Sequence, residues 1–217
     1  MPLEMSPTSF LADYWQWIAV KNGGYISAQN AIFERGGYKY SNGSEDGVIN
    51  ADIASTIDLD NVTIQDNVRA IGCASVGGSI NIANSLLRRN FYGGVLNNNC
   101  NLAISRSVIS DNQYSLFDTV TAFAVETHSA KTRLEDLTIK NIKGTAVTFD
   151  KALDGTLFKN SLISDSTIGI YIKDGTQTVD NINFENLSIG IKQTGLATTT
   201  FKNMSGQNFL NVVTTTT

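Results

Sequence analysis

The stretch STIDLDNVTIQDN, residues 55–67, places apolar side chains at alternate positions on both sides of Asn61. Strict alternation of apolar and polar residues is typical of a strand that buries one face. Asparagine also tolerates the left-handed backbone conformation better than most other residues with a side chain. We therefore interpret the stretch as two short strands joined by a corner at Asn61.

The same pattern recurs along the chain. The corner position occurs eight times, with spacings of 21–24 residues except for two of 30 and 31 residues. The residue two positions earlier is always apolar, and the residue three positions later is apolar in all copies except the last, Gly206. A period of this length indicates a repeat architecture. The corner residues are Asn30, Asn61, Asn84, Arg106, Asp136, Asn160, Asn181 and Asn203.

The period within each repeat decides the fold class. Helical repeats would need apolar residues at helical spacing, and leucine-rich repeats would need leucines at fixed offsets, and the chain shows neither pattern. We predict an all-β, right-handed parallel β-helix of about eight coils of 21–24 residues, stacked about 4.8 Å apart. A second corner is expected near Asn67, Asn90 and Asn112. The domain is expected to span residues 15–213, after an N-terminal extension or the end of a preceding coil (1–14) and before a tail (214–217).

This pattern resembles the right-handed parallel β-helix of the pectin-lyase-like superfamily, from residue 15 to about residue 210. The segment YWQWIAVKNGGYISAQNAIFERGG, residues 14–37, resembles part of bacterial secreted and cell-surface β-helix proteins. The resemblance implies an extracellular or cell-surface location. Glycosidases of the superfamily use clustered aspartates with a histidine and a basic residue, and its lyases use Arg or Lys, often with Ca²⁺. Neither the catalytic histidine segment nor the paired-aspartate motif occurs here, so no catalytic residue is carried over.

The two long spacings suggest a binding groove. Both add about eight residues at the same part of the coil, so the two loops should leave the same face, with roots about 14 Å apart from three strand spacings. Their aromatic rings could stack on sugars and their polar side chains could bind hydroxyls. The alternative is that the rings only pack each loop onto its coil. The candidate ligand-binding residues are Tyr38, Tyr40, Glu45, Asp46, Tyr114, Phe117, Phe123, Glu126 and His128.

Acid–base chemistry needs at least two titratable groups at one place. In the outward column beside the corner, Glu135 with Lys159 and Arg133 is the one mixed patch on neighbouring coils. These three residues and His128 are the catalytic candidates. The alternative is a solvated sheet face with ordinary cross-strand charge pairs.

The composition of the chain limits which partners and cofactors are expected. The formal net charge of −4 gives no electrostatic support for nucleic-acid binding, and no apolar run is long enough for membrane insertion. The single histidine makes no zinc site, no cofactor is expected, and Ca²⁺ has only scattered oxygen ligands in its favour. Cys73 and Cys100 lie on adjacent coils but three residues out of phase, so we expect free or buried thiols unless the loop doubles back.

The sequence therefore favours a non-catalytic β-helix module of a secreted or surface protein. Its role would be glycan binding or adhesion, with a polysaccharide or cell-surface glycan as partner, or that of a rigid spacer. The alternative is a polysaccharide lyase or glycoside hydrolase, including the phage tailspike type, that acts between the two inserted loops. Exposed strand edges at the end coils would also permit self-association.

Overall fold

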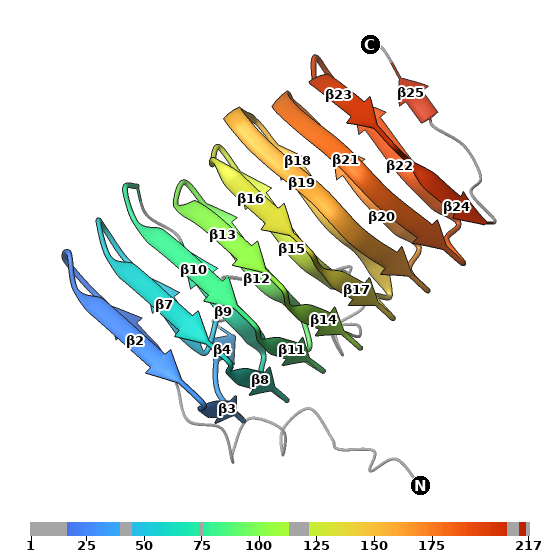
Figure 1. Cartoon of the computed structure of the whole chain (residues 1–217). Coiled ribbons are helices and arrows are strands. Elements are labelled where there is room, and N and C mark those ends of the chain that lie inside the picture. Colours follow the sequence, from blue (N-terminus) through green and yellow to red (C-terminus); the bar gives the residue numbers. More distant parts are fainter. Residues whose placement is uncertain (1–16, 40–44, 74–75, 113–121, 208–212, 216–217) are drawn as a thin grey trace, which may run out of the picture.

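The computed structural model describes residues 17–39, 45–73, 76–112, 122–207 and 213–215. The described residues form short strands and no helix. These strands stack turn upon turn into an elongated parallel β-solenoid, with β2 near one end and β23 near the other (Figure 1).

Each turn contributes strands to two sheets. One is a nine-stranded parallel sheet, and the other contains the strands on either side of the first corner, here called the pre-corner and post-corner strands. The nine-stranded sheet contains, in order, β1 (Ile18–Val20), β6 (Ile49–Ala51), β9 (Arg69–Cys73), β12 (Gly93–Asn98), β15 (Ala122–His128), β18 (Gly144–Asp150), β20 (Ile168–Ile172), β22 (Ile189–Thr194) and β25 (Val213–Thr215).

Two of the strands in the second sheet run through the first corner without a break, namely β19 (Ala152–Ser164) and β21 (Gly175–Glu185). The other pre-corner strands are β2 (Tyr25–Gln29), β7 (Thr56–Asp60), β10 (Ser79–Ala83), β13 (Asn101–Ser105), β16 (Thr132–Glu135) and β23 (Thr198–Lys202). The other post-corner strands are β3 (Ile32–Glu34), β8 (Thr63–Gln65), β11 (Leu86–Arg88), β14 (Val108–Ser110), β17 (Thr138–Lys140) and β24 (Ser205–Gln207). A separate antiparallel pair is formed by β4 (Tyr38–Lys39) and β5 (Glu45–Asp46).

The apolar columns of the repeat form the interior. Leu59, Ile82 and Ile104 are paired in register on β7, β10 and β13, and each is at most 2% exposed. The column after the corner behaves in the same way, since Ile64 and Leu87 are paired on β8 and β11 and are fully buried. Equivalent side chains of successive turns therefore lie above one another in one dry core, which confirms the predicted fold.

The first corner has the predicted backbone conformation. All eight corner residues have positive φ, between 47° and 56°. Their side chains are exposed and bond along the stack, as where Asn61 Nδ2 donates to Asn30 Oδ1 at 2.6 Å and Asn181 Nδ2 donates to Asn160 Oδ1 at 3.0 Å.

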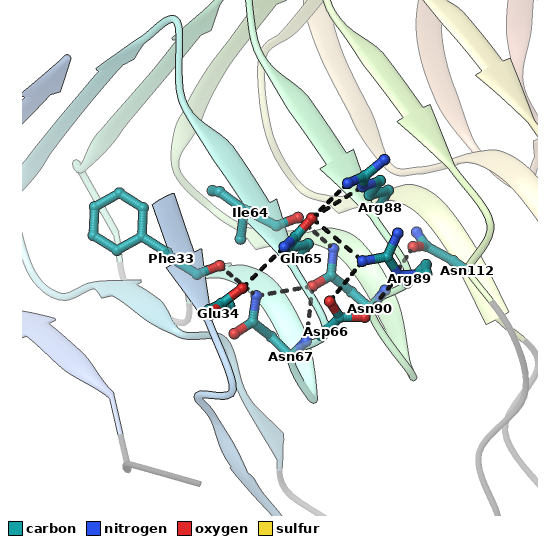
Figure 2. Close-up of polar contacts among 10 residues, drawn as sticks. All are labelled: Phe33, Glu34, Ile64, Gln65, Asp66, Asn67, Arg88, Arg89, Asn90 and Asn112. Carbon is teal, nitrogen blue, oxygen red and sulfur yellow. Dashed lines mark hydrogen bonds and ion pairs between the residues drawn. The ribbon is translucent and has the colours of Figure 1, made fainter. Parts of the chain in front are cut away.

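A buried asparagine ladder forms at the second corner. There the left-handed residue is the one before each asparagine, for example Asp66 (φ 58°) and Arg89 (φ 51°). The side chains of Asn67, Asn90 and Asn112 consequently turn inward and are fully buried. Figure 2 shows the hydrogen bonds that link them.

The ladder amides bond to one another and to buried backbone groups of the corner. Asn90 Oδ1 accepts from the backbone N–H of Asn67 at 3.2 Å and from its Nδ2 at 3.0 Å. Asn90 Nδ2 donates to the Ile64 carbonyl at 3.1 Å, and the Asn90 N–H donates to Asn112 Oδ1 at 3.1 Å. The ladder therefore supplies hydrogen-bond partners to buried polar groups of the corner.

The number of closed turns is about six, fewer than the eight expected. Six turns, beginning with β7, β10, β13, β16, β19 and β21, keep both apolar columns buried. In the two terminal turns the equivalent residues are only half-buried, as for Ala28 and Phe33, or 39% exposed, as for Phe201. The difference arises because no described turn stacks on the outer side of these end turns.

The expectation of free thiols is wrong, because Cys73 and Cys100 form a disulfide with Cα atoms 6.3 Å apart. Cys73 is paired with Asn97 in the sheet, as the phase of the repeat requires. Asn99 then adopts a left-handed conformation (φ 69°), and the Asn97 side chain bonds to both the N–H and the carbonyl of Cys100. The chain thus doubles back and brings the second sulfur inward.

Candidate functional site

Most of the predicted loop groove lies outside the described residues. Tyr40, Tyr114 and Phe117 belong to ranges that the structure does not describe. Both inserted segments connect a post-corner strand to the nine-stranded sheet, as expected from their shared place in the coil. The groove between them stays a prediction. Of Tyr38, Glu45 and Asp46 the structure describes the strand backbone of β4 and β5 and not the side chains.

Three predicted ligand-binding residues lie together on β15, namely Phe123, Glu126 and His128. The alternate residues Val125 and Thr127 are fully buried and face the core. Period-two alternation therefore places Glu126 and His128 on the outer face of the nine-stranded sheet.

The parallel register brings residues of later turns beside them. Glu126 is paired with Thr148, which is followed in the same column by Tyr171 and Lys192. His128 is paired with Asp150. These neighbours were not predicted as site residues. They could be found from the sequence only by aligning the strands of the nine-stranded sheet across turns.

His128 joins two carboxylates. Its Nε2 lies 3.0 Å from Glu126 Oε1, and its Nδ1 lies 3.1 Å from Asp150 Oδ2. Lys173 Nζ lies 3.9 Å from the same Asp150 oxygen. The side chains are a quarter to a third exposed, so the cluster is shielded but reachable from solvent.

The cluster shifts the protonation of its members. The hydrogen bond with Glu126 raises the pKa of His128 above its ordinary value, against the opposing effect of burial, and Asp150 adds to the rise. Burial alone would raise the pKa of Glu126, but the bond from His128 and the nearby charges of Lys173 and Arg69 leave that pKa below its ordinary value. The imidazole is thus held toward its charged form, with both of its ring nitrogens bonded to carboxylates.

Beside the cluster lies a groove with a volume of about 300 Å³ on the outer face of β15, β18 and β20. Tyr171 is half-buried in it, with Lys192 Nζ 4.7 Å and Lys173 Nζ 5.5 Å from the ring centroid. Phe123 is only 5% exposed, so it forms a side of the groove more than a stacking platform. The side chains that line it include Phe123, Glu126, Thr145, Thr148, Tyr171 and Lys173.

The other predicted patch lies on a different sheet. Glu135 is paired in register with Lys159, whose Nζ is 3.4 Å from Glu135 Oε2, and Arg133 Nε is bonded to Glu135 as well. The side chain of Arg133 is 62% exposed. The contacts are those of cross-strand charge pairs on a solvated face, and His128, on β15, is not part of the patch.

Among the described residues there is neither a metal site nor a membrane-spanning helix. In that part of the chain no group of three or more His, Cys, Asp or Glu side chains could hold a metal ion. No helix in the described ranges is long and apolar enough to cross a bilayer.

Among known proteins, a solved structure is similar to this chain, while sequence comparisons give no match. No family model matches the chain, and no curated protein sequence matches it. The solved catalytic domain of a GH87 alpha-1,3-glucanase, in complex with nigerose, is similar in structure with a TM-score of 0.45 and 12% sequence identity. The match covers 89% of this chain and 53% of that one, so the chain spans about half the length of the glucanase domain. The assignment to the parallel β-solenoids rests on the strand register described above.

Proposed function

We propose that the chain is a glycan-binding β-helix module and that the groove on β15, β18 and β20 is its binding site. The observation that carries the proposal is the position of Tyr171, a partly open ring set among hydrogen-bonding side chains. Binding sites for small polar molecules combine apolar or aromatic walls with a few placed polar groups. A sugar fits such a site because its C–H face can pack on the ring while its hydroxyls bond to the groups around it.

The groups around the ring offer both acceptors and donors. Glu126 accepts hydrogen bonds, Lys173 donates them, and the hydroxyl groups of Thr145 and Thr148 do both. All of them project from strands of a continuous parallel ladder, and a rigid scaffold lowers the conformational entropy lost on binding.

The disulfide supports the extracellular or cell-surface location that we propose for the module. Cys73 and Cys100 are the two cysteines of the chain, and they are paired. Disulfides persist in oxidising compartments and are rare in the cytosol of most organisms.

A second candidate function rests on the Glu126–His128–Asp150 arrangement. The imidazole and its two carboxylates place titratable groups at the edge of the same groove, as cleavage of a polysaccharide by hydrolysis or elimination would need. Both ring nitrogens are bonded to carboxylates, so a substrate would have to displace one of these contacts before His128 could donate a proton to it. The test is release of reducing ends or of unsaturated products from a polysaccharide panel, with His128→Gln as the variant. Activity that His128→Gln removes would favour the enzyme. Glycan binding without any product would favour the binding module.

The binding proposal is tested on a glycan array with purified protein. Tyr171→Ala should weaken binding of at least one glycan about tenfold, as expected for losing one buried aromatic contact. Tyr171→Phe, which keeps the ring, and Phe201→Ala, which removes an exposed ring on β23, should bind that glycan as the wild type does. Binding that is the same in all four proteins would refute the proposed site.

A further inference from the structure

A second groove, of about 360 Å³, lies on the outer face of the pre-corner strands β2, β7, β10 and β13. None of its residues belongs to the nine-stranded sheet, so it is separate from the site proposed above. No residue of this groove was predicted as a ligand contact.

The floor of the second groove is low because its side chains are small. In one outward column Asp60 is followed in register by Ala83 and Ser105. In the neighbouring column Asn81 is followed by Ala103. Small side chains on β10 and β13 let a flat molecule approach the sheet closely.

Long side chains stand beyond this floor on the next strand. Arg133 follows Ala103 in register, and Glu135 follows Ser105. The low stretch is therefore bounded along the stack by β7 on one side and by β16 on the other.

Two carboxylates on β7, those of Asp58 and Asp60, are oriented by hydrogen bonds from the next turn. Asn81 Nδ2 donates to Asp58 Oδ1, and Asn84 Nδ2 donates to Asp60 Oδ1, both at 2.6 Å. Each bond occupies one of about four acceptor positions of a carboxylate, so each carboxylate is oriented and can accept more donors. Gln29, in register with Asp60, adds an amide with both a donor and an acceptor.

An exposed aromatic ring completes the groove. Tyr25 begins β2 and is 64% exposed, the kind of ring on which the C–H face of a sugar packs. Ser27 and Gln29, at alternate positions on the same strand, are on its outward face too. The groove thus offers an aromatic platform, hydroxyl and amide groups, and oriented acceptors.

The charge of this groove differs from that of the first. Its charged lining side chains, Asp58 and Asp60, are both negative. The first groove instead has Lys173 in its lining and Lys192 over its tyrosine. Carboxylates repel an acidic polysaccharide but accept the hydroxyl protons of an uncharged one.

We propose that the groove lined by Tyr25, Gln29, Asp58, Asp60 and Ala103 binds a neutral oligosaccharide, independently of the Tyr171 groove. The module would then hold two glycan segments on two faces of one rigid rod. Two linked sites raise the avidity for a polymer that can reach both.

The test is calorimetric titration with neutral hexasaccharides (cellohexaose, xylohexaose, maltohexaose and laminarihexaose), with hexagalacturonate and chitosan hexamer as charged counterparts. At least one neutral hexamer should bind. Ala103→Phe, which fills the floor on the outward face, and Tyr25→Ala should each weaken that binding at least about tenfold. Tyr171→Ala should leave it within about twofold, because its ring is on another sheet.

The proposal is overturned if no neutral hexamer binds, if binding survives both Ala103→Phe and Tyr25→Ala, or if only the chitosan hexamer binds. It is also overturned if Tyr171→Ala removes the same binding. Thermal unfolding verifies that each variant is folded, and Tyr25→Ala is the decisive variant because it removes an exposed ring. If Tyr25→Ala weakens binding of the neutral hexamer and Tyr171→Ala does not, the result supports this second groove even where the Tyr171 groove binds no glycan.

Discussion

His128 Nε2 lies 3.0 Å from Glu126 Oε1 on the same strand, where alternation places residues two apart on one face. The contact ties the charge of the imidazole to that of the carboxylate. Because both groups titrate, the contact also makes the free energy of unfolding depend on pH.

Titration of His128 should give a pKa above 6.5, its ordinary value. Because the folded pKa is raised, the interaction contributes its full stabilisation below pH 6.5 and loses it as the pH rises through the folded pKa. The lowered pKa of Glu126 acts in the opposite sense, with stabilisation present above 4.5 and lost as the pH falls through the folded pKa. The pair should therefore stabilise the protein most between about pH 4.5 and 6.5.

The measurement is simple because the chain has one histidine. Proton NMR follows a single imidazole across pH in the wild type and in Glu126→Gln. The variant should titrate at lower pH, and the stability difference between wild type and His128→Gln should shrink above pH 6.5. A wild-type pKa at or below the ordinary value would show that the contact is not formed in solution.

The Cys73–Cys100 disulfide should add about 3.5 kcal/mol to the free energy of unfolding. The bond closes a loop with a sequence separation of 27, and chain-entropy arguments give this magnitude for such a loop. Urea unfolding of the wild type is compared with that of the Cys73→Ala, Cys100→Ala double variant. Thiol titration of the denatured, unreduced protein should find no thiol, and two thiols would disprove the bond.

Asn90→Ala should destabilise the protein by about 2 kcal/mol, because it leaves the buried backbone N–H of Asn67 without the Asn90 Oδ1 acceptor. The matched control is Asn61→Gly, at an exposed corner where φ is 51° and glycine is tolerated. Its effect should stay within about 0.5 kcal/mol. Equal losses in urea unfolding would mean that the buried ladder has no special part in stability.

Gly93→Ala should change the shape of the groove on β15, β18 and β20. A Cβ atom at Gly93 would lie 2.6 Å from the Phe123 ring, which forms a side of that groove. The ring must move, at a cost of about 1–3 kcal/mol, and glycan affinity should fall with it. Gly77→Ala, where the space around the new Cβ is open, should lower stability through backbone strain and leave binding unchanged. Unaltered affinity in Gly93→Ala would place Phe123 outside the site.

The fold could be predicted because its signals are local and repeat. Alternation sets which residues face inward, and left-handed corners fix the phase, so the pairing of Leu59 with Ile82 followed from the sequence. The disulfide was missed because a single left-handed residue, Asn99, turns the chain back. The buried ladder was not placed because asparagines occur at both corners, and backbone geometry decides which of them face inward.

The site was predicted only in part, for a related reason. Glu126 and His128 were named as part of the inserted segment 112–131, and the structure places them on β15. Asp150 and Tyr171 come from later turns, and they reach β15 only through the register of the nine-stranded sheet. The connections into that sheet vary in length, so the corner spacing does not align its strands.

The most direct test of the proposed binding site is an NMR titration of the labelled protein with the array glycan whose binding Tyr171→Ala weakens. The backbone amide shifts of Glu126, Thr148 and Tyr171, which are neighbours across β15, β18 and β20, should change together and saturate with one affinity. Shift changes that leave these three amides untouched while other parts of the chain respond would contradict the account.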